Sequence, residues 1–484
     1  MMKYSISSFI FSLLLLVIAA PPAQAKIFDI QTTTLENGMQ VVFIPNNRAP
    51  VVTHMVWIKA GAVDEKPGHT GLAHFLEHLM FKGTDKTGPG EFSRIVKSFG
   101  AEHNAFTSKD FTAYFETLST SHLGDVMRLN ADRLQNLAPP MEEVESERDV
   151  VLEERRQRVE NNPMRQFQEH LRASFYLTHP YARPVVGWMD ELKKINWDHA
   201  LDFYKKWYVP NNMILVVTGD VSFDEVVRLA REHYGPMKAK ALPERGRPVL
   251  PALIGQKTLR YEGDDVFQSR LFKLYAAPNY TDDKNKALAL QVLQEIISGA
   301  PTTYLHQKLV VDQKLASSIN VYYSDYARYQ TLVYVVGTPV EGISPERLDR
   351  EIDNALRQLY ETNLSEDMVT NAKKRLVAEA IYARDSLSGP AMIVGRALSV
   401  GVSIDDIENW DKNIANVPFD DVREALGSII ISPGHAPVTG YLTPAADKNT
   451  DDRTRNNVDD AMEDKDKNSG EAGDTRNSTQ EPPQ

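Results

Sequence analysis

The sequence predicts an α+β protein of two halves of similar size, each containing strands and helices. Short β-branched runs alternate with longer amphipathic or charged segments along the chain. A basic, proline-rich stretch, residues 238–251, interrupts this pattern near the middle and is typical of a linker. The second half also repeats parts of the first: 418–426 (PFDDVREAL) echoes 197–203, and 436–442 (APVTGYL) echoes 216–221 (VVTGDV).

The individual elements follow from residue type and spacing. Two early runs, 40–45 (QVVFIP) and 51–60 (VVTHMVWIKA), are rich in β-branched residues and are predicted as strands. Alternating or continuous apolar residues predict two more strands at 111–117 and 213–218. Helices are predicted for the remaining regular segments of this half, at 74–78 and its flanks, 90–99, 142–158, 198–207 and 223–234.

Residues 1–25 have the parts of a secretory signal, with a basic start, an apolar run and a small-x-small site at Ala23-Gln24-Ala25. The apolar run of about twelve residues is shorter than the roughly 20 that cross a bilayer. We therefore expect cleavage after Ala25, no membrane span in the mature chain, and a periplasmic or secreted protein. A membrane anchor is the alternative interpretation.

The expected domains are a first domain at 26–237, the linker, and a second domain of similar fold at 252–446. Residues 447–484 are acidic and contain no aromatic residue, so we expect a disordered tail. The net charge of −12 argues against a nucleic-acid-binding protein. Because there is no cysteine, disulfides, thiol catalysis and Cys-ligated zinc are excluded, and His, Asp and Glu are the strong metal ligands available.

The most specific motif is His74-Phe75-Leu76-Glu77-His78, an H-x-x-E-H pattern. On a helix, His74 and His78 lie one turn apart on one face, a spacing at which both rings can bind one Zn²⁺. Glu77 points to the same side and can accept a proton from water without being a ligand. Apolar flanks predict a buried helix, where unpaired polar groups are costly and a metal is the simplest partner. A polar helix face is the alternative.

A third ligand is expected from a His or carboxylate on another rigid element. Glu147 and Glu154 are seven residues apart on a predicted helix, so both lie on one face. Val150 and Val151 lie on or beside that face, which predicts that it is buried. The alternative is a solvated face of ion pairs, because this helix is crowded with Glu and Arg. The same ligand types would also suit Mn²⁺ or Co²⁺.

Together these residues resemble the pitrilysin/insulinase family of zinc metallopeptidases, the inverzincins, and among them the bacterial processing-peptidase-like members. The resemblance covers roughly residues 26–442 and is carried by several further stretches: 56–65 (VWIKAGAVDE), 70–84 (TGLAHFLEHLMFKGT), 104–115 (NAFTSKDFTAYF), 179–187 (HPYARPVVG) and 208–221 (YVPNNMILVVTGDV). It implies two similar halves, each an antiparallel sheet packed with helices, that form half of a clamshell-shaped peptidase chamber.

The resemblance also implies roles for single residues. His74, His78 and Glu154 would bind one Zn²⁺ per chain, Glu77 would be the general base, and Glu147 would support a ligand from outside the metal's coordination sphere. Asn104 and Ala105 would lie on an exposed strand edge, to which a peptide or unfolded polypeptide substrate adds as a further strand. From its residue type alone, Asn104 would be a turn residue.

The chain departs from the family pattern in its second half. Family members that act alone place an Arg and a Tyr in a stretch that corresponds to residues 309–317, where this chain has Val310 and Ser317. Neither side chain can stabilise the oxyanion of a tetrahedral intermediate. We therefore expect a homologous zinc-less subunit that supplies the Arg and Tyr, and a weakly active homodimer is the alternative.

The sequence thus predicts an exported zinc metalloendopeptidase, the metal-bearing subunit of a two-subunit enzyme. The rival hypothesis is a non-enzymatic, metal-stabilised peptide-binding or scaffold subunit, supported by the missing Arg and Tyr. A folding factor for exported chains is a third hypothesis. Glu77 argues against a purely structural metal, because such a site has no need of a base and fills its fourth position with protein.

Overall fold

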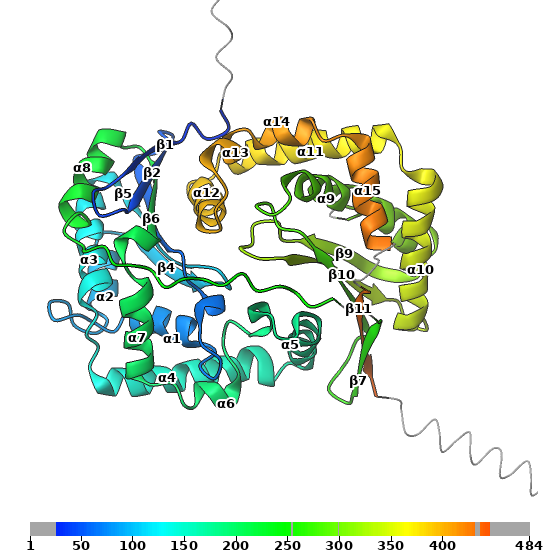
Figure 1. Cartoon of the computed structure of the whole chain (residues 1–484), viewed down its shortest axis with the longest axis horizontal. Helices are drawn as coiled ribbons and strands as arrows, with labels where there is room; N and C mark the ends of the chain where they lie inside the picture. The colour runs from blue at the N-terminus through cyan, green and yellow to red at the C-terminus, as the bar shows by residue number, and fades with distance from the viewer. Residues whose placement is uncertain (1–25, 253–254, 299, 431–435, 446–484) are drawn as a thin grey trace, which may run out of the picture.

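The computed structural model describes residues 26–252, 255–298, 300–430 and 436–445, and shows two sheets that are each packed with helices (Figure 1). The predicted α+β class and the two similar halves are confirmed. The expected signal (1–25) and acidic tail (447–484) lie outside the described residues. In the part that is described, no helix is both long and apolar enough to cross a bilayer.

The first sheet contains six strands in the order β1-β2-β6-β3-β5-β4. Only β2 and β6 are parallel, and the other neighbours are antiparallel. The strand β4 is therefore an edge, paired with β5 alone. In chain order the bounds are Gln31–Thr34, Gln40–Pro45, Val51–Ile58, Glu102–Thr107, Thr112–Ser119 and Met213–Gly219 for β1 to β6.

The second sheet has five strands in the order β7-β11-β8-β10-β9, with β7 and β11 as its parallel pair, and this order repeats that of β2-β6-β3-β5-β4 without a counterpart of β1. The predicted repeat of 216–221 in 436–442 corresponds to a repeat in the structure. Residues 216–221 overlap β6 and residues 436–442 overlap β11, and each of these strands belongs to the parallel pair of its sheet. The bounds of β7 to β11 are Lys257–Gly263, Arg270–Ala277, Ala316–Tyr323, Thr331–Pro339 and Val438–Pro444.

Helices pack against both sheets. In the first half they are α1 to α8, at Leu72–Leu79, Glu91–Ser98, Leu123–Asn136, Met141–Arg155, Pro163–Tyr176, Met189–Leu192, Trp197–Trp207 and Phe223–His233. In the second half they are α9 to α15, at Lys284–Ile297, Pro345–Gln358, Glu366–Ala383, Gly389–Ser399, Ile404–Glu408, Trp410–Ala415 and Phe419–Ile430. The predicted helices are confirmed, although the one at 142–158 passes into a π-helical turn after Arg155.

One hydrophobic cluster contains residues of both halves. Helix α12 of the second half packs against β3 and β6 of the first (Figure 1). Gly395 makes this approach possible, because a Cβ there would lie 2.1 Å from the ring of the fully buried Trp57. The backbone of the N-terminal segment also joins the halves, since the Phe28 N–H donates to the Glu408 carboxylate at 2.9 Å.

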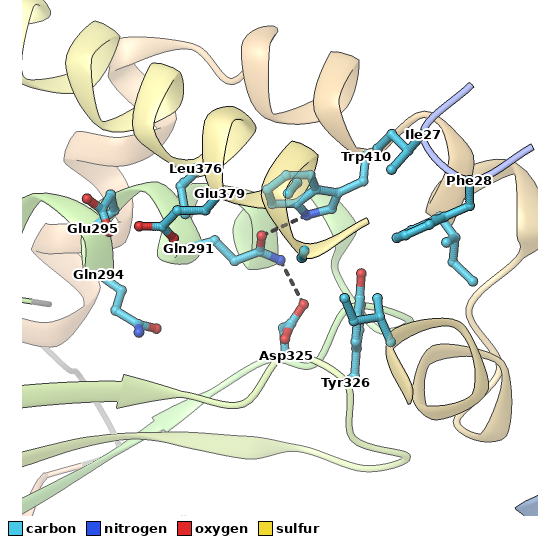
Figure 2. A pocket seen from close by; sticks show the side chains of 14 residues that line it. Ile27, Phe28, Gln291, Gln294, Glu295, Asp325, Tyr326, Leu376, Glu379 and Trp410 are labelled. Carbon is cyan, nitrogen blue, oxygen red and sulfur yellow. Dashed lines mark hydrogen bonds between the residues drawn. The ribbon is translucent and has the colours of Figure 1, made fainter. Parts of the chain in front are cut away.

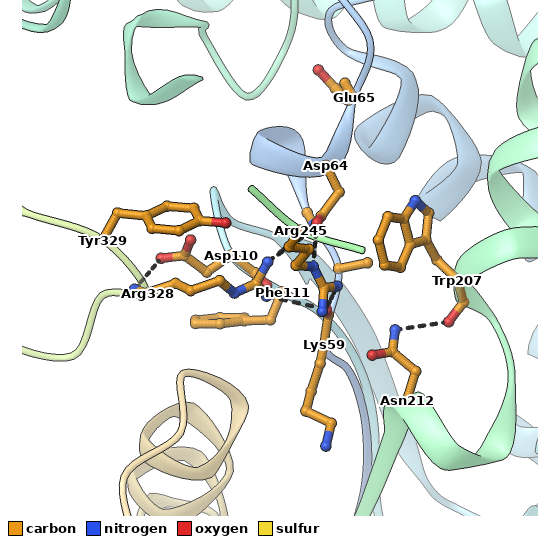
Figure 3. A network of polar contacts seen from close by, with 12 residues as sticks. Lys59, Asp64, Glu65, Asp110, Phe111, Trp207, Asn212, Arg245, Arg328 and Tyr329 are labelled. Atoms are coloured by element: carbon orange, nitrogen blue, oxygen red, sulfur yellow. Dashed lines mark hydrogen bonds and ion pairs between the residues drawn. The ribbon is translucent and has the colours of Figure 1, made fainter. Parts of the chain in front are cut away.

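A half-buried polar network lies at the same junction (Figure 3). Arg328 of the second half contacts the Asp64 carboxylate at 3.1 Å and donates to the Asp110 carbonyl at 2.5 Å. Arg245 binds the other oxygen of Asp64 at 2.7 Å and stacks over Trp207. Arg245 belongs to the predicted linker 238–251, which has no helix or strand and is nonetheless held against the first half. The boundaries of this linker stay predictions.

Ile27 and Phe28 line one side of a cavity of about 410 Å³ that lies among the second-half helices (Figure 2). Phe28 lines it together with Trp410 and Gln291. The Trp410 indole donates to Gln291 at 2.9 Å, and the Gln291 amide donates to Asp325 at 2.7 Å. Burial raises the pKa of the Asp325 carboxyl to about 6.

Candidate metal centre

Helix α1 carries the H-x-x-E-H motif on a buried segment. Its apolar residues pack into the core of the first half, and His74 and His78 face away from that core with ring centroids 4.7 Å apart. The helix begins after Gly71, whose φ of +86° and close contact with the Val186 carbonyl exclude a side chain. The Glu65 carboxylate accepts the Gly71 and Ala73 N–H groups, which satisfies the start of the helix.

Helix α4 packs across α1 and carries the two predicted carboxylates. Val151 is 1% exposed, as expected, but the prediction that Val150 is buried is wrong, because it is 47% exposed. The physical reason is the helical spacing: Glu147 and Glu154 lie at the border of the buried face, and Val150 lies beyond them on the solvent side. This border position places both carboxylates beside the imidazoles while leaving Glu154 accessible.

The three predicted ligands converge. The Glu154 oxygens lie 3.6 Å from His74 Nε2 and 3.3 Å from His78 Nε2. Among the described residues, these three form the one group of metal-binding side chains whose ligand atoms all lie within 4.8 Å of one another. Two ring nitrogens and one carboxylate oxygen that face a common point form a donor set suited to catalytic zinc.

Hydrogen bonding fixes the ring of His78 in the orientation that a metal ligand needs. Its Nδ1–H donates to Glu147 at 2.7 Å, which leaves Nε2 to face Glu154. Burial alone would lower the pKa of His78, but its hydrogen bonds to Glu147 and Glu154 outweigh burial and raise the pKa to about 9. Burial lowers the pKa of His74 to about 4, so this ring is neutral, whereas a metal would have to displace the proton from His78 Nε2.

Glu77 lies beside these ligands without joining them. Burial raises the pKa of its carboxyl, and a hydrogen bond from the Thr107 hydroxyl, 2.6 Å long, partly opposes this shift. Thr107 is the last residue of β4, so the edge strand directly contacts the proposed base. A raised pKa makes this carboxylate a stronger base than an ordinary glutamate, which suits it to accept and return a proton.

The edge strand β4 carries the two predicted substrate residues. Asn104 is exposed, and its side-chain oxygen accepts the Ala105 N–H at 2.8 Å. Asn104 is thus a strand residue and not the turn residue that its type alone suggests. A peptide that used the Ala105 N–H would have to displace the Asn104 side chain.

The three ligands, Glu77, Glu147, Asn104 and Ala105 all line one cavity of about 1110 Å³. Its lining residues all fall between 74 and 186, so the described second half contributes none of them. Val310 lies in a π-helical segment packed on the second-half core, and Ser317 lies on β9 with its hydroxyl 3.3 Å from the Thr338 carbonyl. Neither residue lines the cavity.

Sequence reasoning missed several residues around the centre. Glu65 orients α1, Thr107 contacts Glu77, Lys82 forms an ion pair with Glu147, and Arg158 forms one of 2.5 Å with Glu154. The four-residue spacing could have suggested two of these contacts. Lys82 follows His78 by one helical turn, and Arg158 follows Glu154 by one helical turn. Thr107 and Glu65 approach through tertiary contacts that no local pattern reports.

Comparison with known proteins gives the family. Residues 40–187 match the family described as insulinase (peptidase family M16), and residues 194–376 match the peptidase M16 inactive domain. The chain is 32% identical to the zinc protease PqqE of Helicobacter pylori over 383 residues, which cover 77% of this chain and 84% of that protein. The chain belongs to the M16 peptidase family.

A second relative and a solved structure are also similar to this M16 chain. It is 27% identical to the beta subunit of the mitochondrial-processing peptidase of Neurospora crassa, over 78% of this chain and 81% of that subunit. The crystal structure of a protease from Helicobacter pylori superimposes with a TM-score of 0.79 at 26% identity, covering 86% of this chain and all of the other. The family and the fold that the motifs imply are therefore confirmed.

Proposed function

We propose that this chain is a zinc metalloendopeptidase that hydrolyses peptides bound along β4. The observation that supports this proposal is that His74, His78 and Glu154 converge. Glu77, a buried carboxylate that is not part of this donor set, lies beside them. Zinc held by these three side chains would supply a Lewis acid that activates water and polarises a carbonyl. The names of the relatives as zinc proteases support this proposal.

The protein's own groups would move the proton. Glu77 would take it from the attacking water and return it to the leaving amine as the peptide bond breaks. Thr107 would hold the Glu77 carboxylate toward the cleft through its 2.6 Å hydrogen bond. Glu147 would hold the His78 ring through its Nδ1–H. The β4 edge, with Asn104 and Ala105, would align an extended peptide through main-chain hydrogen bonds.

We propose that the active enzyme has two subunits. The cavity that holds the metal ligands is lined by the first half alone, and Val310 and Ser317 offer no group for an oxyanion. A homologous chain without the H-x-x-E-H motif would supply an Arg and a Tyr from the opposite side. The similarity to a processing-peptidase beta subunit supports this arrangement. A homodimer is the alternative partner, and export to the periplasm or medium remains part of the proposal.

The test compares variants of the full-length chain by zinc content and by cleavage of a fluorogenic peptide, alone and mixed with a zinc-less homologue. Glu77→Gln should keep zinc and lose nearly all activity, whereas His74→Ala, His78→Ala and Glu154→Ala should lose zinc. Glu153→Gln is the matched control, because the side chain of this exposed neighbour on α4 has its hydrogen bonds, among the described residues, with Arg156 and Gln157. Cleavage that survives in Glu77→Gln would refute the assignment of the base.

The rival function, a peptide-binding or scaffold subunit, makes a different prediction. Such a chain would bind zinc and peptide but would show no chelator-sensitive cleavage with any partner. High activity of the purified chain by itself would instead rule out the need for a second subunit. The proposed domains, 26–237 and 252–446 with the linker 238–251, can be tested by limited proteolysis of the same preparation.

A further inference from the structure

A second cavity lies at the junction of the two halves, directly beside the metal cavity. Its volume is about 510 Å³, and it shares two lining residues, Phe106 and Val185, with the metal cavity. We call it the junction pocket. Its walls come from the β4–β5 turn, α5, the segment between β9 and β10, and α12. Aromatic rings form much of its surface, and three cations line it, Lys109, Arg172 and Arg396.

Two of these cations form no ion pair with a carboxylate in the part of the chain that the structure describes. Arg172 and Arg396 are both exposed, and within the described residues neither guanidinium has a carboxylate within ion-pair distance. Arg172 lies over the Tyr334 ring at 5.6 Å, and Arg396 donates to the Ser324 hydroxyl at 2.8 Å. Each guanidinium carries five N–H donors, so most of the donors on both side chains remain available.

Lys109 is the third cation that lines the junction pocket. Its ammonium donates to the carbonyls of Tyr181 and Arg183, which uses two of its three hydrogens. Burial lowers the pKa of Lys109 to about 7, and the nearby Arg172 adds to this shift. A carboxylate in the pocket would favour the charged form of this lysine.

The carboxylates near the pocket are already engaged. Asp110, the one acidic lining residue, accepts the Tyr181 hydroxyl at 2.7 Å and the Arg328 N–H at 3.2 Å. Glu169 is bound by both terminal nitrogens of Arg155, and Glu65 is bound by the start of α1. Asp325 stabilises Arg396 electrostatically, but its hydrogen-bond partner is Gln291 in the separate cavity of Figure 2. The pocket therefore keeps an excess of positive charge.

The edge strand leads from the metal cavity into this pocket. Asn104 to Thr107 line the metal cavity, while Phe106 and Ser108 line the junction pocket. A strand rises about 3.3 Å per residue, so Ser108 lies about 10 Å beyond Ala105. A peptide added to β4 next to Glu77 would thus present a group to the pocket about two to four residues from the bond that is cut.

We propose that the junction pocket binds a carboxylate of the peptide substrate through Arg172, Arg396 and Lys109. This inference rests on the proposed function, because it assumes a peptide along β4. It predicts selectivity for peptides that carry an acidic side chain or a free C-terminal carboxylate a few residues from the cleaved bond. This group would lie on the part of the peptide that extends along β4 toward Ser108. The aromatic walls, including Phe111 and Tyr176, would cover the aliphatic part of that residue.

The test measures binding of short fluorescein-labelled peptides to zinc-loaded, full-length Glu77→Gln protein, so that cleavage does not interfere. Three otherwise identical peptides carry either a Glu at the position that faces the pocket, a Gln there, or a Gln there with an amidated C-terminus. A charge-assisted hydrogen bond is stronger than a neutral one, and screening in an open pocket reduces the gain, so the preferred acid should bind about 10-fold more tightly.

The variants identify the cations. Arg172→Gln and Arg396→Gln should each remove most of the preference, and Arg172→Lys and Arg396→Lys should restore part of it. Arg231→Gln is the matched control, because this exposed arginine on α8 also lacks a carboxylate partner among the described residues and lies outside the junction pocket. A preference for Glu over Gln identifies a side chain as the ligand, and a loss only on amidation identifies the C-terminus.

Each outcome either supports or overturns the proposal. Equal affinities for all peptides, including equally undetectable binding, overturn it, as does a preference that survives in both Gln variants. Absence of cleavage by the wild-type chain with every partner, together with an intact acid preference in binding, would reject the proposed function and retain the pocket. Cleavage without any acid preference would reject the pocket and retain the function.

Discussion

Thr107 on the edge strand donates a 2.6 Å hydrogen bond to the Glu77 carboxylate on α1. The strand on which a peptide would bind is therefore connected to the proposed base by a single contact. Thr107 is the last residue of β4, so the same segment that would align a substrate also orients the group that would move the proton. This connection depends on the packing of β4 against α1 and is absent from any local sequence pattern.

Replacement of Thr107 should affect the proposed base without affecting zinc. Thr107→Val removes the hydrogen bond but keeps the side-chain shape, and hydrogen bonds to charged groups are worth about 1.5–3 kcal/mol, so kcat should fall about 10-fold or more. Because this bond lowers the pKa of Glu77, its loss should raise that pKa and move the acidic limb of the pH–rate profile upward. Thr107→Ser should behave as wild type, and an unchanged profile in Thr107→Val would contradict the contact's role.

Glu147 should determine how tightly zinc is held. Its carboxylate accepts the His78 Nδ1–H and forms an ion pair with Lys82. Loss of such a supporting carboxylate typically weakens metal binding about 10- to 100-fold, and we expect this for Glu147→Gln in a competition titration with a chelating dye. Glu143→Gln is the control, because Glu143 contacts the same lysine at 3.5 Å but not His78. Equal zinc affinities in the two variants would refute this role.

Gly395 should be needed for the joining of the two halves. Alanine would place its Cβ 2.1 Å from the buried Trp57 ring, and such overpacking costs typically about 1–3 kcal/mol. Alanine favours a helix over glycine by about 1 kcal/mol, so the net loss in the free energy of unfolding should be up to about 2 kcal/mol. Gly427→Ala on α15, where the nearest atom is 3.1 Å away, should change stability less in the same denaturant titration.

Asp325 should make stability depend on pH. Its pKa is raised by burial to about 6 from a model-peptide value of 3.8, so between these values the folded state binds more protons than the unfolded state. The contribution of Asp325 to wild-type stability is therefore most favourable below pH 3.8. It decreases as the pH rises to about 6. Asp325→Asn removes this titration and should be more stable than wild type by about 3 kcal/mol at about pH 7, and by much less at about pH 4.

Urea titrations of chelated wild-type and Asp325→Asn protein across this pH range measure the difference directly. Chelation removes the separate effect of zinc release at low pH, which both proteins would share. The side-chain amide of the variant keeps a carbonyl oxygen that can accept the Gln291 N–H, so the hydrogen bond drawn in Figure 2 need not be lost. A difference that is constant with pH would show that the Asp325 pKa is normal.

Much of the fold could be predicted from short-range patterns. The β-branched runs became β2 and β3, and the helical spacing of the H-x-x-E-H residues became α1. The repeat of 197–203 in 418–426 identified α7 and α15, each of which precedes the strand that enters the parallel pair. Val150 shows the limit of this approach, because one hydrophobic residue cannot show on which side of a helix the buried face ends.

Local sequence was sufficient to place His74, Glu77 and His78 on one side of a helix, because a helical repeat of 3.6 residues depends only on local backbone geometry. It also placed Glu147 and Glu154 on one face of a second helix. The folded chain was needed to show that these two faces meet, that Thr107 contacts Glu77, and that a cationic pocket adjoins the end of β4. Those relationships arise from the packing of distant segments, and the free energy that selects them comes from the whole core.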